Sequence, residues 1–162
     1  MSNTIIAIDP GREKCGIAVV NSTRGALFQT VIPTADLSHH TTKLAAEYNT
    51  TTIILGNGTA HQYAKTALTN AVAAGNPFTI TLVDEHRSTE EARKRYWHHN
   101  PPTGWRRLIP VTMQVPPVPV DDYVAVILAE RYFASQKEVE VPLHVPLAKG
   151  GNRPQAEGDS ME

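Results

Sequence analysis

The chain has 162 residues, a length that suits one domain with a single core and excludes a two-domain enzyme. Hydrophobic residues make up 41% and charged residues 19%, which is typical of a soluble globular protein and excludes disordered or collagen-like chains. The formal net charge of −1 excludes a protein that binds nucleic acid through its overall positive charge. A polyanion would have to bind at a local basic patch.

The opening of the chain predicts an antiparallel meander. The β-branched run Thr4–Ile8 ends at an Asp-Pro-Gly turn, which is typical of a buried strand. Gly16–Asn21 and Ala26–Ile32 have similar composition, and the turn residues Ser22–Gly25 separate them. Neighbouring strands joined by such short turns are antiparallel.

After Pro33 the pattern alternates between helix and strand. Thr51–Leu55 and Phe78–Val83 are the next predicted strands, and a helix containing Leu37, Leu44 and Tyr48 precedes the first of them. The helix between the two strands is predicted from a capping box and an apolar stripe. The capping box is Thr59 with Gln62, and the apolar stripe consists of Tyr63, Ala67, Ala71 and Ala74. Strands that alternate with helices predict parallel βαβ units.

The last third of the chain contains two predicted helices around a long loop. Ser88 and Glu91 have capping-box spacing at the start of the first helix, and Asp121 begins the second. Six prolines between Trp97 and Val120 predict a loop, and loops of that length in compact domains are often functional. We expect one folded domain over residues 1–136 and a flexible tail over 137–162, where Pro, Gly and charged residues dominate.

Acidic residues stand at three of the predicted element ends. They are Asp9, the pair Asp84 and Glu85, and the pair Asp121 and Asp122. If the strands share one sheet, their carboxyl ends meet at one edge, where carboxylates favour Mg²⁺ or Mn²⁺ over zinc. Turn chemistry and helix capping are the alternative roles for each of these residues.

Three segments of the chain resemble one family of nucleases. Ile5–Val20 carries the motif Asp-x-Gly-x-x-x-x-Gly-x-Ala and resembles the first hairpin of the YqgF/RuvX family of RNase H-like nucleases and of the related RuvC resolvases. Val83–Arg93 resembles the family segment Asp-Glu-Arg-x-Ser/Thr-Thr-x-x-Ala, with His86 in place of its arginine. Val120–Phe133 resembles the last helix, so the matches span about residues 4 to 134 in the family's order.

The resemblance implies an α/β, RNase H-like fold, namely a mixed five-stranded sheet whose first three strands are antiparallel, with helices on both faces. It also implies that Asp9, Glu85 and Asp121 are catalytic and hold Mg²⁺ or Mn²⁺. Asp122 is a further candidate metal ligand or a helix cap, and an offset of one residue would exchange its role with that of Asp121.

The segment from His86 to Arg107 is a candidate nucleic-acid surface, because its net charge is +4 and aromatic residues interleave with the basic ones. The candidate contacts in and near it are Lys14, Arg87, Arg93, Arg95, Trp105, Arg106 and Arg107. The alternative is a solvated helix face followed by a loop whose tryptophans pack on the core. Lys14 is equally compatible with an ordinary surface turn.

Glycines are expected close to the predicted site, where they allow tight turns and a close approach to a phosphate or a metal-bound water. These loop residues are Gly11, Gly56, Asn57 and Gly58. A plain strand-to-helix turn is the alternative for the last three.

The single cysteine, Cys15, excludes a disulfide within the chain and fits a reducing cytoplasm. Thr4–Ile8 is too short for a signal-peptide core, and no apolar run approaches the roughly 18 residues of a membrane helix. We therefore expect a cytoplasmic protein without a membrane contact.

The resemblance implies hydrolysis of RNA phosphodiesters, with the precursor of 16S ribosomal RNA as the expected substrate. Two alternatives stay open. One is a Holliday junction resolvase that acts on branched DNA as a homodimer. The other is a non-catalytic RNase H-like module that binds nucleic acid, as in the transcription accessory protein Tex; the complete acidic triad favours an enzyme. The oligomeric state, monomer or homodimer, is open.

Overall fold

A computed structural model describes residues 3–58 and 60–140 of the chain, with side chains described as far as Lys137. The strands are β1 (Thr4–Asp9), β2 (Lys14–Asn21), β3 (Gly25–Pro33), β4 (Thr52–Gly56) and β5 (Thr79–Val83). The α-helices are α1 (Leu37–Glu47), α2 (His61–Ala73), α3 (Ser88–His99) and α4 (Asp121–Glu140). Short 3-10 helices are η1 (Thr34–Asp36), η2 (Gly104–Leu108) and η3 (Val111–Met113).

The five strands form one mixed sheet in the order β3-β2-β1-β4-β5. Adjacent strands are antiparallel between β1 and β2 and between β2 and β3, whereas β1, β4 and β5 run parallel. The expected antiparallel opening and parallel continuation are confirmed. Because β1, β4 and β5 run parallel, their carboxyl ends lie at the same edge of the sheet.

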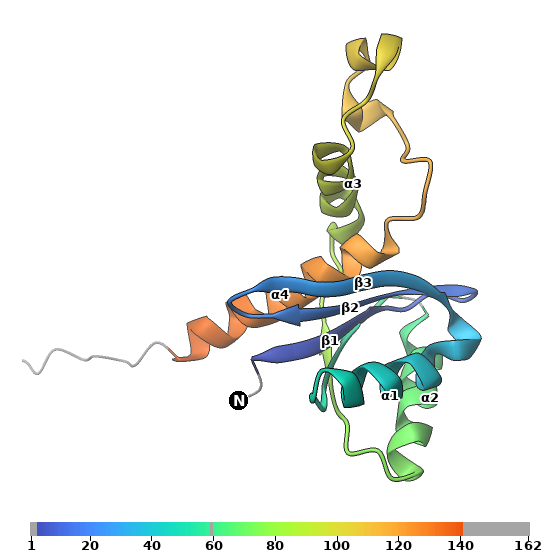
Figure 1. Ribbon diagram of the computed structural model, residues 1–162, viewed down its shortest axis with the longest axis vertical. Helices are drawn as coiled ribbons and strands as arrows, with labels where there is room; N and C mark the ends of the chain where they lie inside the picture. Colours follow the sequence, from blue (N-terminus) through green and yellow to red (C-terminus); the bar gives the residue numbers. More distant parts are fainter. Residues whose placement is uncertain (1–2, 59, 141–162) are drawn as a thin grey trace, which may run out of the picture.

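The alternation of side chains along β1 explains the two helical layers. Ile6 and Ile8 are fully buried on the face covered by α1 and α2, while Ile5 and Ala7 are fully buried on the face covered by α4 (Figure 1). Helices on both faces are therefore confirmed. Cys15 is fully buried in the first of these cores, which agrees with a packing role.

Helix α3 packs against α4 beside the sheet, and residues 100–120 form an arm that extends beyond it (Figure 1). The predicted loop does exist, but it begins after His99 because α3 continues through Trp97. Two short 3-10 helices, η2 and η3, interrupt it.

Two local predictions about helix starts and faces are wrong. Helix α3 has Arg87 as its N-cap, at a left-handed φ of 57°, so Ser88 is its first helical residue and caps nothing. Helix α2 begins at His61 and has Ala60 as its N-cap; Thr59 lies outside the described residues. The expected stripe on α2 is displaced, because Tyr63 is 62% exposed. The residues that face the core are Ala64, Leu68 and Ala71.

Helix α4 reaches Glu140, so it extends past the predicted start of the tail at residue 137. The remainder of that segment, residues 141–162, lies outside the described residues. No helix in the described part of the chain combines the length and apolar character needed to cross a bilayer.

Candidate active site

Asp9 is the last residue of β1, and its side chain lies on the α4 face of the sheet because it follows Ile5 and Ala7 in alternation. Gly16 pairs with Asp9 across the antiparallel ladder. On the other side, Gly56 follows Leu55, the parallel partner of Ile8. Asp9 thus stands in a row of the sheet between two glycines, so neither adjacent strand places a side chain beside it in that row.

Gly16 makes room for helix α4. A Cβ atom at this position would lie 1.9 Å from the backbone oxygen of Asp121 and 2.8 Å from the backbone nitrogen of Asp122. Only a residue without a side chain allows the first turn of α4 to lie this close to β2. This close approach brings Asp121 to the same end of the sheet as Asp9.

Gly56 and Gly58 form a cradle for the carboxyl group of Glu85. A Cβ at Gly56 would lie 1.8 Å from Oε1 of Glu85, and one at Gly58 would lie 2.1 Å from its Oε2. The backbone N–H of Glu85 donates to Oδ1 of Asn57 at 3.2 Å, and the N–H of Asn57 donates to the carbonyl of Val83 at 3.0 Å. Gly56, Asn57 and Gly58 therefore surround the turn that carries Glu85 and position its carboxylate. Gly11 lies instead in the turn between β1 and β2, where a Cβ would be 2.1 Å from the backbone oxygen of Lys14.

The environment of these carboxyl groups favours their protonated forms in the absence of a cation. Burial, followed by the charges of Glu85 and Asp121, raises the pKa of Asp9 from 3.8 to about 8. Burial also raises the pKa of Glu85, against the opposing effects of Asp9, the Gly58 backbone and His61. Three acidic groups that repel one another at one site are typical of functional centres.

Asp121 belongs to the same electrostatic group, and Lys14 lies near it. Burial raises the pKa of Asp121, the positive charge of Lys14 opposes the rise, and Asp122 adds to it. Asp122 itself accepts a hydrogen bond from Nε2 of Gln29 on β3, at 3.0 Å. The structure therefore brings Asp121 near Asp9, and it turns Asp122 towards the sheet edge at β3.

The donor set fits a hard divalent cation. Oε1 of Glu85 is buried and has no hydrogen-bond partner among the described residues, so a shared proton or a cation is needed to satisfy it. Within the described residues, no three His, Cys, Asp or Glu side chains are gathered closely enough to enclose one ion. Mg²⁺ keeps several waters and is commonly bound through one or two carboxylates, so this arrangement is compatible with it.

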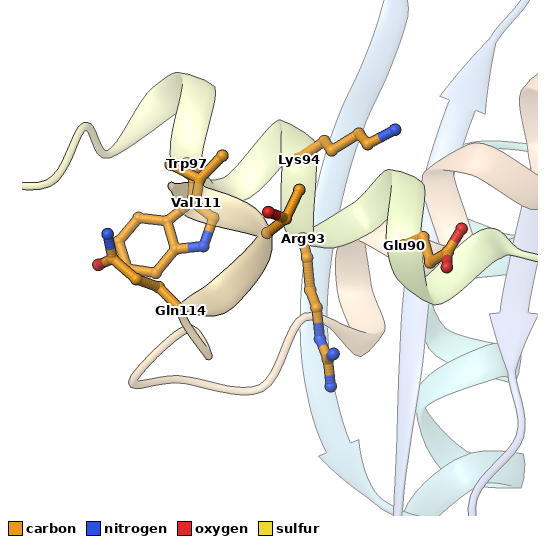
Figure 2. A pocket seen from close by; sticks show the side chains of 7 residues that line it. Glu90, Arg93, Lys94, Trp97, Val111 and Gln114 are labelled. Atoms are coloured by element: carbon orange, nitrogen blue, oxygen red, sulfur yellow. The ribbon is translucent and has the colours of Figure 1, made fainter. Parts of the chain in front are cut away.

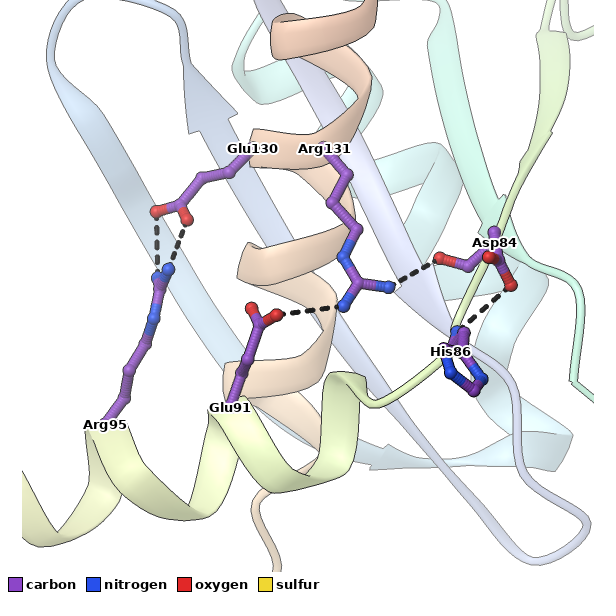
Figure 3. Close-up of polar contacts among 6 residues, drawn as sticks. All are labelled: Asp84, His86, Glu91, Arg95, Glu130 and Arg131. Carbon is purple, nitrogen blue, oxygen red and sulfur yellow. Dashed lines mark hydrogen bonds and ion pairs between the residues drawn. The ribbon is translucent and has the colours of Figure 1, made fainter.

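Arg131 supports the turn that carries Glu85, and the sequence pattern did not point to it. Its Nη1 donates to the backbone oxygen of Asp84 at 2.9 Å, and its Nη2 pairs with Oε1 of Glu91 at 3.1 Å (Figure 3). One side chain of α4 thus ties the end of β5 to the first turn of α3. His61 is a second missed neighbour: it contacts the carbonyl of Gly58 through Nδ1 at 2.6 Å and lies near Glu85.

The predicted basic contacts lie in different surroundings. Arg95 forms a bidentate ion pair with Glu130 of α4, with Nη1 2.9 Å from Oε1 (Figure 3). Its side chain therefore links α3 to α4. Arg87, Arg93, Arg106 and Arg107 are exposed. Trp105 is 69% exposed with the Arg106 guanidinium 5.8 Å from its ring centroid, whereas Trp97 is 9% exposed. The alternative of core packing is therefore correct for Trp97 and wrong for Trp105.

The sheet order and helical layers are those of the RNase H-like class of folds. Within it, the chain is similar to RuvC of Thermus thermophilus, with a TM-score of 0.53, 13% identity, and coverage of 83% of this chain and 96% of RuvC. RuvC in complex with a Holliday junction substrate gives the same TM-score and identity. The Holliday junction resolvase of fowlpox virus matches with a TM-score of 0.52 and 11% identity over 82% of this chain and 99% of the resolvase.

Neither a protein-family profile nor a curated protein matches the sequence. The RNase H-like fold expected from the three motifs is therefore confirmed, whereas membership of YqgF in particular is not. At such low identity the similarity to RuvC and to the viral resolvase concerns the fold.

Proposed function

We propose that this protein is a metal-dependent nuclease in which Asp9, Glu85 and Asp121 form the active site. The observation that carries the proposal is the buried Oε1 of Glu85, which lacks a hydrogen-bond partner among the described residues and lies in a glycine cradle next to Asp9. A binding-only module gains nothing from repelling carboxylates in a buried place, because they lower its stability.

The residues divide the work by position. Asp9 is fixed at the end of a central strand, Glu85 is held by its cradle, and Asp121 is brought in by the first turn of α4. When bound, a divalent cation supplies Lewis acidity towards a phosphodiester and its attacking water. The carboxylates bind and orient that cation, and Lys14 offers a positive charge beside Asp121 for a phosphate oxygen.

The arm and helix α3 supply the surface for the polyanion. No Asp or Glu occurs between Ala92 and Val120, and the exposed arginines of this stretch are Arg93, Arg106 and Arg107. Trp105 is exposed on the arm and suits stacking on an unpaired base. The near-neutral whole molecule thus has one local region with the charge that nucleic acid requires.

Branched DNA is the substrate class that we favour, in place of the ribosomal RNA precursor expected from the YqgF resemblance. Three solved structures that share the fold, over 96% or more of their own chains, are named as RuvC or as a Holliday junction resolvase. Symmetric cutting of a four-way junction needs two active sites, so this substrate entails a dimer on the DNA.

Cleavage assays with three labelled substrates test this proposal. The purified protein is incubated with a four-way DNA junction, a linear duplex of the same arm sequence, and single-stranded RNA, each with Mg²⁺, Mn²⁺ or EDTA. We expect metal-dependent cutting of the junction that falls at least about 100-fold in Asp9→Asn. Glu13→Gln is the matched control, because it removes a carboxylate from the exposed turn of the same hairpin.

The outcomes separate the parts of the proposal. Cutting of RNA with an intact junction would refute branched DNA as the substrate. Binding of all three substrates without cutting under either metal would refute the nuclease. Equal loss in Asp9→Asn and Glu13→Gln would show that the effect is not specific to the carboxylate site.

A further inference from the structure

A pocket of about 250 Å³ lies between helix α3 and the arm, apart from the three carboxylates (Figure 2). Arg93, Lys94 and Trp97 line it from α3, and Val111, Thr112 and Gln114 line it from η3 and the residue that follows. This volume far exceeds the roughly 30 Å³ of one water and approaches the lower end of small-ligand pockets. The pocket therefore has room for a ligand of a few ring atoms.

The indole of Trp97 brings an unused donor to this pocket. Trp97 is 9% exposed, and its Nε1 is buried without a hydrogen-bond partner among the described residues. Its ring is held edge-on by Tyr96, with centroids 5.1 Å apart. Because a buried donor left unpaired destabilises the protein, a ligand that brings an acceptor here is favoured.

The polar groups of the pocket offer both donors and acceptors. Nε2 of Gln114 already donates to the backbone oxygens of Arg106 and Ile109, each at 2.9 Å, so its carbonyl oxygen is the side left to accept. Glu90 also lines the pocket and can accept from an amino group. A neutral ring with acceptors and donors on its edge matches this set, and an inorganic anion does not.

Positive charge lies at the rim of the pocket. The side chains of Arg93 and Lys94 extend from α3 in different directions, with their charged ends away from the indole (Figure 2). Both are exposed, and neither forms an ion pair within the described residues. A ligand with a ring inside and a phosphate outside would use both parts.

We propose that this pocket binds one unpaired nucleotide, with its base beside Trp97 and its phosphate at the rim, to which Arg93 and Lys94 give a positive charge. The source of that nucleotide, a nucleic acid bound by the protein, rests on the proposed function. The ring-edge acceptors of a base pair with the indole N–H, and its amino or imino groups pair with Gln114 or Glu90. Binding is non-covalent and needs no metal.

The indole N–H signals of the full-length protein test the proposal directly. The chain contains two tryptophans, so Trp105→Phe assigns the Trp97 signal in a ¹H–¹⁵N spectrum. Asp9→Asn in EDTA is titrated with deoxynucleoside monophosphates, with deoxyribose 5-phosphate, and with inorganic phosphate. We expect a saturable shift of the Trp97 signal with the nucleotides and none with the two base-free phosphates.

Two variants measure the two halves of the pocket. Trp97→Phe keeps a ring but removes the donor, and should weaken nucleotide binding about 5-fold, as for one lost hydrogen bond of about 1 kcal/mol. Arg93→Gln with Lys94→Gln should weaken nucleotide binding and leave the Trp97 shift at saturation unchanged. A short single-stranded oligonucleotide, compared with one that has an abasic position, shows whether a base within a nucleic-acid chain also enters the pocket.

No shift with any nucleotide would overturn the proposal, and an equal shift with inorganic phosphate would replace it by a simple anion site. Because these titrations use a cleavage-deficient variant without metal, their result does not depend on the nuclease proposal. Nucleotide binding without cutting of either DNA or RNA would keep the pocket and refute the nuclease, and cutting without a Trp97 shift would do the reverse.

Discussion

Replacing Asp9 by Asn is expected to stabilise the metal-free protein at neutral to alkaline pH. Burial, with Glu85 and Asp121 nearby, raises the pKa of Asp9 from 3.8 to about 8. The unfolded chain releases this proton near pH 4, so between about pH 4 and pH 8 the folded state holds more protons than the unfolded state. The stability of the metal-free wild type therefore falls as the pH rises through this window.

The size of this effect follows from the two pKa values. A rise from 3.8 to about 8 sets a ceiling of about 6 kcal/mol, at about 1.4 kcal/mol for each pH unit. Water reaches part of the half-buried Asp9 side chain, so we expect about half of this ceiling, about 3 kcal/mol, at pH 8. For a domain of this length, that gain corresponds to a Tm rise of about 6–12 °C.

Thermal unfolding in EDTA, followed from pH 4 to pH 8, measures the difference between wild type and Asp9→Asn. The two curves should converge at pH 4 and separate as the pH rises, while Glu13→Gln should follow the wild type. Millimolar Mg²⁺ should then raise the Tm of the wild type at pH 8 more than that of Asp9→Asn, since a ligand stabilises the state that binds it. Parallel curves at all pH values would refute the assignment of a destabilising buried carboxyl group at Asp9.

Three further variants test the supporting contacts and the arm. Gly58→Ala places a Cβ 2.1 Å from Oε2 of Glu85. Because that flexible carboxylate can shift, we expect the free energy of unfolding to change by under about 1 kcal/mol. The rate of junction cutting should fall about 100-fold, because the carboxylate is displaced. Equal cutting would contradict the cradle. Arg131→Met should lower the free energy of unfolding by about 1–2 kcal/mol in a denaturant titration, because one hydrogen bond to the backbone of Asp84 and one to Glu91 of α3 are lost. Neutralising Arg106 and Arg107 together should reduce the salt-dependence slope of DNA binding by about two, and an unchanged slope would remove the arm from the interface.

The order of the elements and the location of the acidic residues could be predicted because they depend on local patterns. β-branched runs predicted all five strands, and Asp9, Glu85 and Asp121 stand where those runs or the last helix begin or end. The faces of helix α2 could not be assigned in the same way. Tyr63 offered more apolar surface than its alanine neighbours, yet the space between α2 and the sheet accepts Ala64 and Leu68.

Contacts between distant segments lay beyond the sequence. Arg95 belongs to a basic run that resembles a nucleic-acid surface, and only the packing of α3 on α4 reveals that Glu130 neutralises it. In the sequence, Arg131 is one charged residue of a predicted helix. Its role follows from the fold, which places the backbone oxygen of Asp84, just after β5, beside it. The local sequence shows the charged residues and the hydrophobic periodicity. Which charged side chains pair with one another depends on how the helices pack.

The row formed by Gly16, Asp9 and Gly56 connects the fold to the proposed chemistry. The cores on both faces of the sheet consist of other side chains, so neither glycine is needed to fill them. A Cβ at Gly16 would instead collide with the backbone of Asp121, and one at Gly56 with the carboxyl group of Glu85. Both changes would separate the carboxylates from Asp9 and relieve their mutual repulsion. The two glycines therefore keep Asp121 and Glu85 close to Asp9, as the proposed hydrolytic site requires.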